Sequence, residues 1–363
     1  MSKQNPIKRI FDLYTSDLSY QEIERLVKRD AAEVYEFFSR DIPKPDPTQN
    51  KLTRILIFIR SLFNAFLLKL TPARRVFYLV SLIFALFGII NNIDGYIIFS
   101  FIIINSLLAF ELADKLTSKN EIDLARKIQN ELIPKIPPEN SLYEIAAFYE
   151  SAKEVGGDYF DVIPCGSHKD ELILVIGDIS GKGMAAALYM VRVQAIMHAL
   201  VKASSDPKEI IINLKNTFSE KLLPEYFLTL ITASIKADGS ISMCKAGHPP
   251  VLHFKKSSAE IETINIKGMG IGLKDKGMFE KTIEEKTIIP EKDDIILFYT
   301  DGITEAMNNF KAEYGAERLK NVLVENAHLP VNEIKHKILQ SVYLFRGDTP
   351  QFDDITLVVL KKK

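Results

Sequence analysis

Four short acidic segments contain the residues of this sequence that are best suited to chemistry. Each places an aspartate beside a glycine or at the end of a β-rich run. Such positions let a carboxylate project from a tight turn beyond the edge of a sheet. The segments are Gly156-Gly157-Asp158-Tyr159-Phe160-Asp161, Gly177-Asp178-Ile179-Ser180-Gly181-Lys182-Gly183, Tyr299-Thr300-Asp301-Gly302 and Phe352-Asp353-Asp354-Ile355-Thr356.

Carboxylates that meet at one spot repel one another and take up protons unless cations neutralise them. Oxygen ligands without histidine or cysteine favour Mg²⁺ or Mn²⁺ over zinc. Two such ions ~3.5–4 Å apart can share a water, lower its pKa and hold a phosphoryl group for in-line attack. This chemistry needs no nucleophile from the protein, but it requires that the four segments meet in space.

Each segment taken alone has a simpler interpretation. Asp-Gly and Gly-Asp pairs are common in turns, and a single aspartate at a strand end more often caps a turn than binds a metal. The combination of the four segments, in this order, is much more specific than any one of them.

In that order the segments resemble the metal-dependent protein phosphatases of the protein phosphatase 2C superfamily, and more closely its bacterial SpoIIE-like branch. The resemblance covers about residues 121–361 and begins in the stretches Ala125-Arg126-Lys127-Ile128-Gln129 and Leu132-Ile133-Pro134. It implies an α+β fold, the α-β-β-α sandwich in which an antiparallel β-sandwich is flanked by helices. Besides the acidic segments, the landmarks are Phe227-Leu228-Thr229-Leu230, Ala246-Gly247-His248-Pro249-Pro250, Gly270-Ile271-Gly272-Leu273 and Ile303-Thr304-Glu305-Ala306.

The resemblance also implies roles for individual residues. It assigns two Mn²⁺ or Mg²⁺ ions to a site in which Asp178 and Asp301 are the central, catalytic ligands. The complete implied ligand set is Asp158, Asp178, the backbone carbonyl of Ile179, Asp301 and Asp353.

Four further residues are candidates for supporting roles. Asp161 and Asp354 are candidates for holding ligands or loops in place around the metals. Lys182, between two glycines at a predicted helix start, is a candidate phosphate contact, with a solvated loop lysine as the alternative. His248 could act as a general acid, but the two prolines that follow favour a structural role in a turn.

The activity implied by the resemblance is hydrolysis of phosphoserine or phosphothreonine in proteins. In this branch the usual substrates are small anti-sigma-factor antagonists of the STAS fold. One alternative is a catalytically silent scaffold that binds phosphoproteins, which loss of metal carboxylates would mark. A weaker alternative is a hydrolase of small phosphoesters or nucleotides, although the chain lacks a Gly-x4-Gly-Lys-Ser/Thr phosphate loop.

The elements that must position these residues begin at Tyr143, where short β-rich runs replace longer helical patterns. Because the strands are grouped rather than alternating strictly with helices, we expect a largely antiparallel sheet. The predicted helices are Met184–Lys202, Pro207–Leu223, Glu317–Asn326 and Val331–Leu344. The predicted strands are Tyr143–Glu150, Tyr159–Pro164, Leu172–Ile176, Phe227–Ile235, Ile241–Lys245, Val251–Phe254, Ile261–Ile264, Lys281–Ile289, Ile295–Tyr299 and Ile355–Val359.

A pair of apolar stretches precedes the phosphatase-like part. From Val76 to Phe110, 26 of 35 residues are hydrophobic and Asp94 carries the only charge. Val76–Ile93 would span ~27 Å as a helix and Tyr96–Phe110 ~22 Å, against a hydrocarbon thickness of ~30 Å. Basic residues flank the pair and are absent from its turn, which predicts both ends in the cytoplasm. The alternative is a buried or interfacial helical hairpin of a soluble protein.

These patterns divide the chain into four parts. Residues 1–72 form a helical cytoplasmic region of unknown role, 73–113 the transmembrane hairpin, 114–138 a helical linker and 139–363 the catalytic domain. The first part includes an amphipathic helix over Ile7–Arg40 and an apolar stretch over Leu52–Leu70. Apolar positions in the linker suit pairing with a second copy, so we expect a homodimer. The predicted location is the cytoplasmic membrane, with membrane lipid as a partner.

Composition limits the remaining classes of function. The 46 basic and 47 acidic residues give a net charge of -1, which offers no electrostatic basis for binding nucleic acid. The two cysteines, Cys165 and Cys244, are too few for a disulfide framework or a four-thiolate metal site. The polar and basic start of the chain argues against a signal peptide.

Overall fold

A computed structural model describes residues 51–134, 137–166, 168, 170–274 and 277–363. The chain divides into two compact units, residues 1–117 and 118–363. The amphipathic helix predicted over Ile7–Arg40 lies outside the described residues.

The described part of the first unit is helical. Helix α3 (Lys51–Lys69) is followed by α4 (Pro72–Asn91), and α5 (Asp94–Leu132) begins after a short turn and continues into the second unit. Asn92 adopts the left-handed conformation at the end of α4, as at many helix C-termini. Helices α4 and α5 are long and apolar enough to cross a membrane.

Polar and aromatic contacts hold the α4–α5 hairpin together. Arg74, near the start of α4, forms ion pairs with Glu111 (2.7 Å) and Asp114 (2.6 Å) of α5. At the opposite end, the ring of Phe84 stacks on Tyr96. The two helices therefore form a hairpin, and α5 continues without a break past residue 113 into the stretch predicted as the linker.

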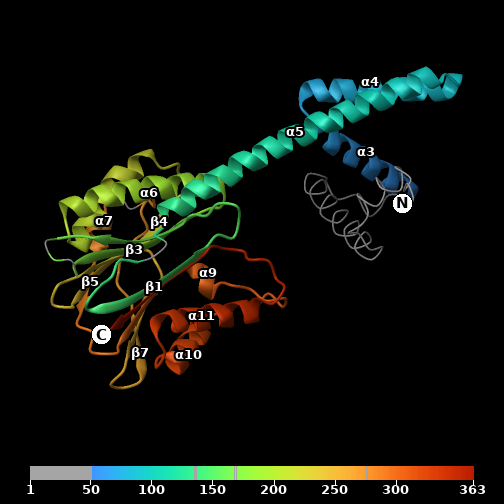
Figure 1. Cartoon of the computed structure of the whole chain (residues 1–363). Helices are drawn as coiled ribbons and strands as arrows, with labels where there is room; N and C mark the ends of the chain where they lie inside the picture. The colour runs from blue at the N-terminus through green and yellow to red at the C-terminus, as the bar shows by residue number, and fades with distance from the viewer. Residues whose placement is uncertain (1–50, 135–136, 167, 169, 275–276) are drawn as a thin grey trace, which may run out of the picture. The chain divides into compact units, whose positions relative to one another are not determined.

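The second unit consists of two stacked five-stranded sheets in which every ladder is antiparallel (Figure 1). The first has the order β1-β10-β9-β6-β7 and the second β2-β3-β4-β5-β8. The strands of the first sheet are β1 (Tyr143–Glu150), β6 (Val251–Lys255), β7 (Glu260–Ile264), β9 (Ile295–Tyr299) and β10 (Ile355–Lys362). Those of the second are β2 (Asp158–Pro164), β3 (Leu172–Ile179), β4 (Leu228–Ile235), β5 (Ile241–Ala246) and β8 (Glu285–Ile288).

Helices cover both outer faces of the sandwich. Helices α6 (Met184–Ala203) and α7 (Pro207–Phe218) pack on the second sheet, and α10 (Ala316–Asn326) and α11 (Val331–Arg346) on the first (Figure 1). Three short helices complete the unit: the 3-10 turn η1 (Ser219–Lys221), α8 (Phe279–Thr282) and α9 (Asp301–Thr304). This is the predicted α-β-β-α sandwich.

The strands form because their sequences can be buried on both faces. The central strand β3 is buried along almost its entire length, since one face packs against the other sheet and the opposite face against helices. Helix α6 is also long and apolar enough to cross a membrane. Its buried face, which includes Met190, Val193 and Met197, packs on this sheet, which accounts for its apolar sequence.

The structure differs from the predicted elements in two places. The strand expected over Lys281–Ile289 is split into helix α8 and the shorter strand β8. Its first residues turn into a helix because Phe279 is buried in the core and starts the turn. The short helix α9, which begins at Asp301, was not predicted, because four residues are too few to show a helical period.

Candidate active site

Two of the predicted ligands lie side by side on neighbouring strands. Asp158 at the start of β2 pairs directly with Asp178 near the end of β3. The side chain of Asp158 is buried and points between the two sheets, where its Oδ2 accepts hydrogen bonds from the hydroxyls of Thr300 (2.8 Å) and Thr356. Asp158 therefore links the second sheet to the two segments of the first sheet that carry the remaining aspartates.

The charges of Asp301 and Asp353 act on Asp178 from the opposite sheet. Burial, and then the negative charges of these two residues, raise the pKa of Asp178 to about 7. Burial and the nearby Asp353 also raise the pKa of Asp301. The pKa of Asp158 is raised well above its usual value, chiefly by burial and then by Asp178. Such mutual repulsion is the electrostatic condition under which a cation binds.

Asp354 holds the loop that leads into β2. Its Oδ1 accepts a hydrogen bond from the backbone N–H of Ala152 (2.7 Å), and its Oδ2 from those of Gly157 (2.6 Å) and Asp158 (3.3 Å). A Cβ added to Gly156 would lie 2.3 Å from Asp354 Oδ2, so only glycine allows this approach. Asp354 thus fixes the backbone at Asp158 through hydrogen bonds.

The predicted backbone ligand faces the same loop. A Cβ added to Gly157 would lie 2.9 Å from the carbonyl oxygen of Ile179 and 3.4 Å from Asp178 Oδ1. The backbone N–H of Ile179 also donates to the Gly157 carbonyl at 3.3 Å. The end of β3 and the glycine pair before β2 are therefore in direct contact, and a side chain at Gly157 would crowd two of the predicted ligand oxygens.

Lys182 lies at the edge of this acidic group. Its Nζ forms an ion pair with Asp353 Oδ2 at 2.8 Å and donates a hydrogen bond to the backbone carbonyl of Phe352. Its side chain is 40% exposed, so it can also be reached from solvent. The lysine partly neutralises the acidic group in the structure.

The donor set fits a hard divalent cation, because it consists of carboxylate and carbonyl oxygens without sulfur or imidazole. Within the part of the chain that the structure describes, no three acidic, histidine or cysteine side chains are already arranged to hold a metal ion. In the structure one oxygen of Asp353 is paired with Lys182, and one oxygen of Asp158 is bonded to two threonines.

The structure does not bring Asp161 to the acidic group. Successive side chains alternate across a strand, so Asp161 points to the face of β2 opposite Asp158. There it accepts hydrogen bonds from the hydroxyl of Tyr159 (3.0 Å) and the backbone of Val162 (2.8 Å), and it contacts His198 of α6 at 2.8 Å. These contacts join a helix to the sheet and place Asp161 away from the predicted ligands.

His248 is buried beside Thr229, with 3.0 Å between its Nδ1 and the threonine hydroxyl. Burial, and then the nearby charge of Lys245, lower its pKa to about 3. The imidazole is therefore neutral at pH 7 and lacks the imidazolium proton that a general acid would donate. This supports the structural role favoured from the two prolines.

Four residues with roles at this site were not singled out from the sequence. Thr300 and Thr356 hold Asp158, and both lie inside the acidic segments. Alternation along β10 would have placed the side chain of Thr356 in the interior. The side chain of Gln129, at the end of α5, donates to the Gly156 carbonyl (2.6 Å) and accepts from the Gly156 N–H (3.0 Å). Burial, and then the negative charge of Asp301, raise the pKa of Glu305. The four-residue spacing between Asp301 and Glu305 would have indicated that the two carboxylates are close.

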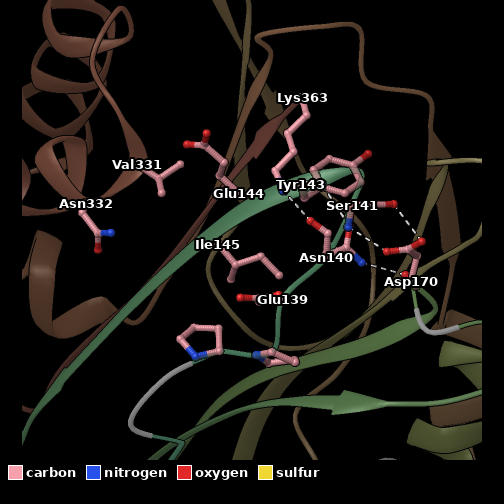
Figure 2. Close-up of a pocket in the computed structure, with 12 residues that line it drawn as sticks. Glu139, Asn140, Ser141, Tyr143, Glu144, Ile145, Asp170, Val331, Asn332 and Lys363 are labelled. Carbon is pink, nitrogen blue, oxygen red and sulfur yellow. Dashed lines mark hydrogen bonds between the residues drawn. The ribbon is translucent and has the colours of Figure 1, made fainter.

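A cavity of about 570 Å³ lies at the opposite end of the sandwich (Figure 2). Several of its polar groups bond one another: Ser141 donates to Asp170 through its backbone and its hydroxyl, and Lys363 donates to the carbonyl of Asn140 (2.6 Å). It contains none of the predicted site residues. We therefore place the candidate active site at the acidic group and not in this cavity.

The chain is similar to known proteins over its C-terminal part. The profile of the family described as Stage II sporulation protein E (SpoIIE) matches residues 168–363, which is more than half of the chain. Phosphoserine phosphatase RsbU of Bacillus subtilis (strain 168) is 28% identical over 253 residues, covering 68% of this chain and 71% of RsbU. Phosphoserine phosphatase RsbP of the same organism is 26% identical, covering 69% of this chain and 59% of RsbP, less than two thirds of that protein.

Among solved structures, the SiaA-PP2C domain of Pseudomonas aeruginosa has the same fold. It superposes with a TM-score of 0.59 at 18% identity, over 69% of this chain and 98% of that domain. The sandwich therefore has the PP2C-like fold, and the similarity to RsbU and RsbP identifies the chain as a protein phosphatase of that class. Within that class, the chain belongs to the SpoIIE family.

Proposed function

We propose that this chain is a membrane-tethered serine/threonine protein phosphatase that depends on two Mn²⁺ or Mg²⁺ ions. The observation that supports the proposal is the pairing of Asp158 with Asp178 at one end of the sandwich, near enough to Asp301 and Asp353 that their charges, after burial, raise the pKa of Asp178. A group of carboxylates that resists ionisation in this way gains most from divalent cations.

In the proposed mechanism, the metals would be held by Asp178, Asp301, Asp353, Asp158 and the carbonyl of Ile179. Bound there, the ions would lower the pKa of a water and stabilise the charge on the phosphoryl group. Thr300 and Thr356 restrict the side chain of Asp158, and Asp354 restricts the backbone beside it. Lys182, which pairs with Asp353 at the edge of the acidic group, would contact a phosphate oxygen of the substrate.

The direct test uses the full chain in detergent micelles with a phosphoserine protein and Mn²⁺. We expect phosphate release that stops on addition of a chelator, and we expect Asp178→Ala and Asp301→Ala to lower turnover at least ~100-fold. Glu325→Gln, an exposed carboxylate on α10, is the matched control and should retain wild-type turnover. Unchanged turnover in the Asp178 and Asp301 variants would defeat the metal-site assignment.

The alternative proposal, a silent scaffold, predicts a different result from the same preparation. It would bind the phosphoprotein without releasing phosphate at any metal concentration. The chain retains every carboxylate of the implied ligand set, which supports the enzyme over the scaffold.

We further propose that the substrate is a serine-phosphorylated STAS-type anti-sigma-factor antagonist in a partner-switching pathway. The family membership supports this class of substrate. Removing the chain from its host should cause one such phosphoprotein to accumulate, which phosphoproteomics would detect. Accumulation of phosphoproteins of other folds alone would contradict the proposal.

We also propose that the linker part of α5 pairs with a second copy. The apolar side chains of Leu116, Leu124 and Ile128 are exposed on this helix and are spaced for such a contact. We expect sedimentation of the full chain in detergent to show a homodimer, and the double variant Leu124→Asp, Ile128→Asp to shift it to monomers. A wild-type monomer would contradict the proposal.

A further inference from the structure

Two exposed phenylalanines stand on loops that lead directly to the predicted metal ligands. Phe310 is 91% exposed, the highest value among the large apolar side chains that the structure describes. Phe352 is 55% exposed and immediately precedes Asp353. A large exposed aromatic ring contributes little to the fold, and aromatic residues are enriched among those that dominate protein contacts.

The loop that carries Phe310 is well ordered by its own hydrogen bonds. Residues 307–313 form a short hairpin that follows α9, with Met307 bridging Glu313. The side chain of Asn308 accepts hydrogen bonds from the backbone of Phe310 (2.9 Å) and of Ala312 (3.1 Å), and Lys311 adopts a left-handed conformation (φ 60°). The ring is thus presented by a defined turn.

The loop that carries Phe352 is held in the same way. The side-chain amide of Gln351 donates to the carbonyls of Asp353 (2.9 Å) and Glu150 (3.2 Å). The carbonyl of Phe352 itself accepts from Lys182. The backbone is thus fixed on both sides of Phe352, and the geometry of the loop leaves the ring exposed.

A hydrogen bond joins the two loops. Thr349 Oγ1 donates to Asn309 Oδ1 at 2.6 Å, so the hairpin and the loop before β10 lie against each other. The first loop starts at the helix of Asp301 and the second ends at Asp353. The two loops that carry the rings therefore lie side by side, and each leads to a residue of the acidic group.

From this arrangement we propose that Phe310 and Phe352 form a docking surface for apolar side chains that flank the phosphoserine of the protein substrate. The inference rests on the proposed function, because a phosphoryl group attached to a protein must bring neighbouring residues to the loops that surround the acidic group. A small phosphate ester reaches the same carboxylates without touching the rings. The two phenylalanines thus act as specificity-determining residues and take no part in the chemical step.

The test compares three substrates on the full chain in detergent with Mn²⁺. Two synthetic phosphoserine peptides have equal length and charge but carry leucine or serine on each side of the phosphoserine, and p-nitrophenyl phosphate is the small ester. We expect the wild type to show a KM about tenfold lower for the leucine peptide, a typical contribution of aromatic contact residues. The double variant Phe310→Ala, Phe352→Ala should lose this preference through KM, with kcat and p-nitrophenyl phosphate hydrolysis unchanged.

Two control variants sharpen the result. Phe310→Leu, Phe352→Leu should retain part of the preference, because apolar area remains. Ile289→Ala, at an apolar residue that is 79% exposed and follows β8 near the opposite end of the strands, should behave as wild type.

Several outcomes would overturn the inference. In one, the wild type cleaves p-nitrophenyl phosphate but shows no preference between the two peptides. In another, the double variant loses activity on all three substrates alike. A preference lost only together with a fall in oligomer size would assign the rings to contact between two copies, and would also overturn it. Failure of the proposed function is distinguishable, since the wild type would then hydrolyse none of the three substrates.

Discussion

At the scale of single residues, neighbouring aspartates have different roles because of the faces they occupy. Asp158 and Asp161 are three positions apart on β2, so their side chains leave opposite faces of the strand. Asp158 enters the space between the sheets and meets Asp178, whereas Asp161 meets His198 of α6. One carboxylate thus lies beside another predicted ligand, and the other joins a helix to the sheet.

Replacing Asp161 by alanine should reduce stability and spare activity. The variant leaves the hydroxyl of Tyr159 buried without its acceptor, which costs ~1–3 kcal/mol. We expect a lower melting temperature for Asp161→Ala, with kcat/KM within about twofold of wild type when both are assayed well below that temperature. Asp158→Ala is the contrasting variant and should lose turnover. A loss of turnover of the same size in the two variants would show that Asp161 supports the metal site.

The raised pKa of Asp178 predicts how the metal-free chain responds to pH. Its folded-state pKa of about 7 lies above the ordinary value of 3.8, so the folded state holds a proton that the unfolded state releases. The corresponding stability is present below about pH 4 and is lost as the pH rises to about 7. We expect the melting temperature in chelator to fall over this range.

The control for this prediction is Asp178→Asn, which removes the titrating group. The melting temperature of this variant should depend less on pH than that of the wild type. At pH 8 it should be higher than the wild-type value by about 2–4 °C for each kcal/mol of repulsion removed. Added Mn²⁺ should raise the melting temperature of the wild type at pH 8 and not that of the variant. Parallel curves for the two proteins would contradict the assignment.

At the scale of elements, the end of α5 is attached directly to the loop that positions Asp158. Gln129 is buried and bonds both the N–H and the carbonyl of Gly156, and the next residue, Gly157, donates to Asp354. A helix that continues into the first unit therefore ends on the backbone beside a predicted ligand. The position of this helix end and the order of the loop must change together.

Gln129→Ala should loosen this loop. The variant leaves both backbone groups of Gly156 without partners, so we expect a loss of ~1–3 kcal/mol in unfolding free energy and weaker Mn²⁺ binding by calorimetry. Gln129→Glu keeps an acceptor for the Gly156 N–H and should have an intermediate effect. Unaltered metal affinity in Gln129→Ala would show that the helix end and the metal site are independent.

At the scale of the whole molecule, an apolar helical hairpin and a complete phosphatase fold occupy one chain. The outward side chains of α4 and α5 are largely apolar, and Arg74 with its two acidic partners marks one end of the hairpin. In water such surfaces would be costly to expose, whereas a bilayer would cover them.

Membrane insertion can be tested by placing charge on the hairpin. We expect the wild-type chain to remain in the membrane fraction after a high-salt wash. The double variant Leu86→Lys, Ile102→Lys should shift the chain toward the soluble or aggregated fraction. Near the bilayer centre each lysine costs up to ~3 kcal/mol. Ile289→Lys in the catalytic unit is the control and should stay with the membrane. A wild type that is released by salt would contradict tethering by the hairpin.

The fold and the composition of the site could be predicted largely from local patterns. Alternation predicted nine of the ten strands within a few residues, because buried strands have a strong period and glycine-aspartate turns end them. The four acidic segments were recognisable because glycine and aspartate together define both a turn and a hard-ligand donor. The prediction of a strand over Lys281–Ile289 was wrong for its first residues, because the burial of Phe279, a long-range contact, favours a helical turn there.

The sequence by itself determined which residue types are available: aspartates in turns, apolar strands and an apolar hairpin, all properties of neighbouring residues. Only the tertiary structure decided which aspartates meet, since strand register sends Asp158 inward and Asp161 outward. It also decided that Lys182 pairs with Asp353, that two threonines hold Asp158, and that Gln129 reaches Gly156. These contacts join segments up to about 200 residues apart, and no local period encodes the geometry of packing between sheets.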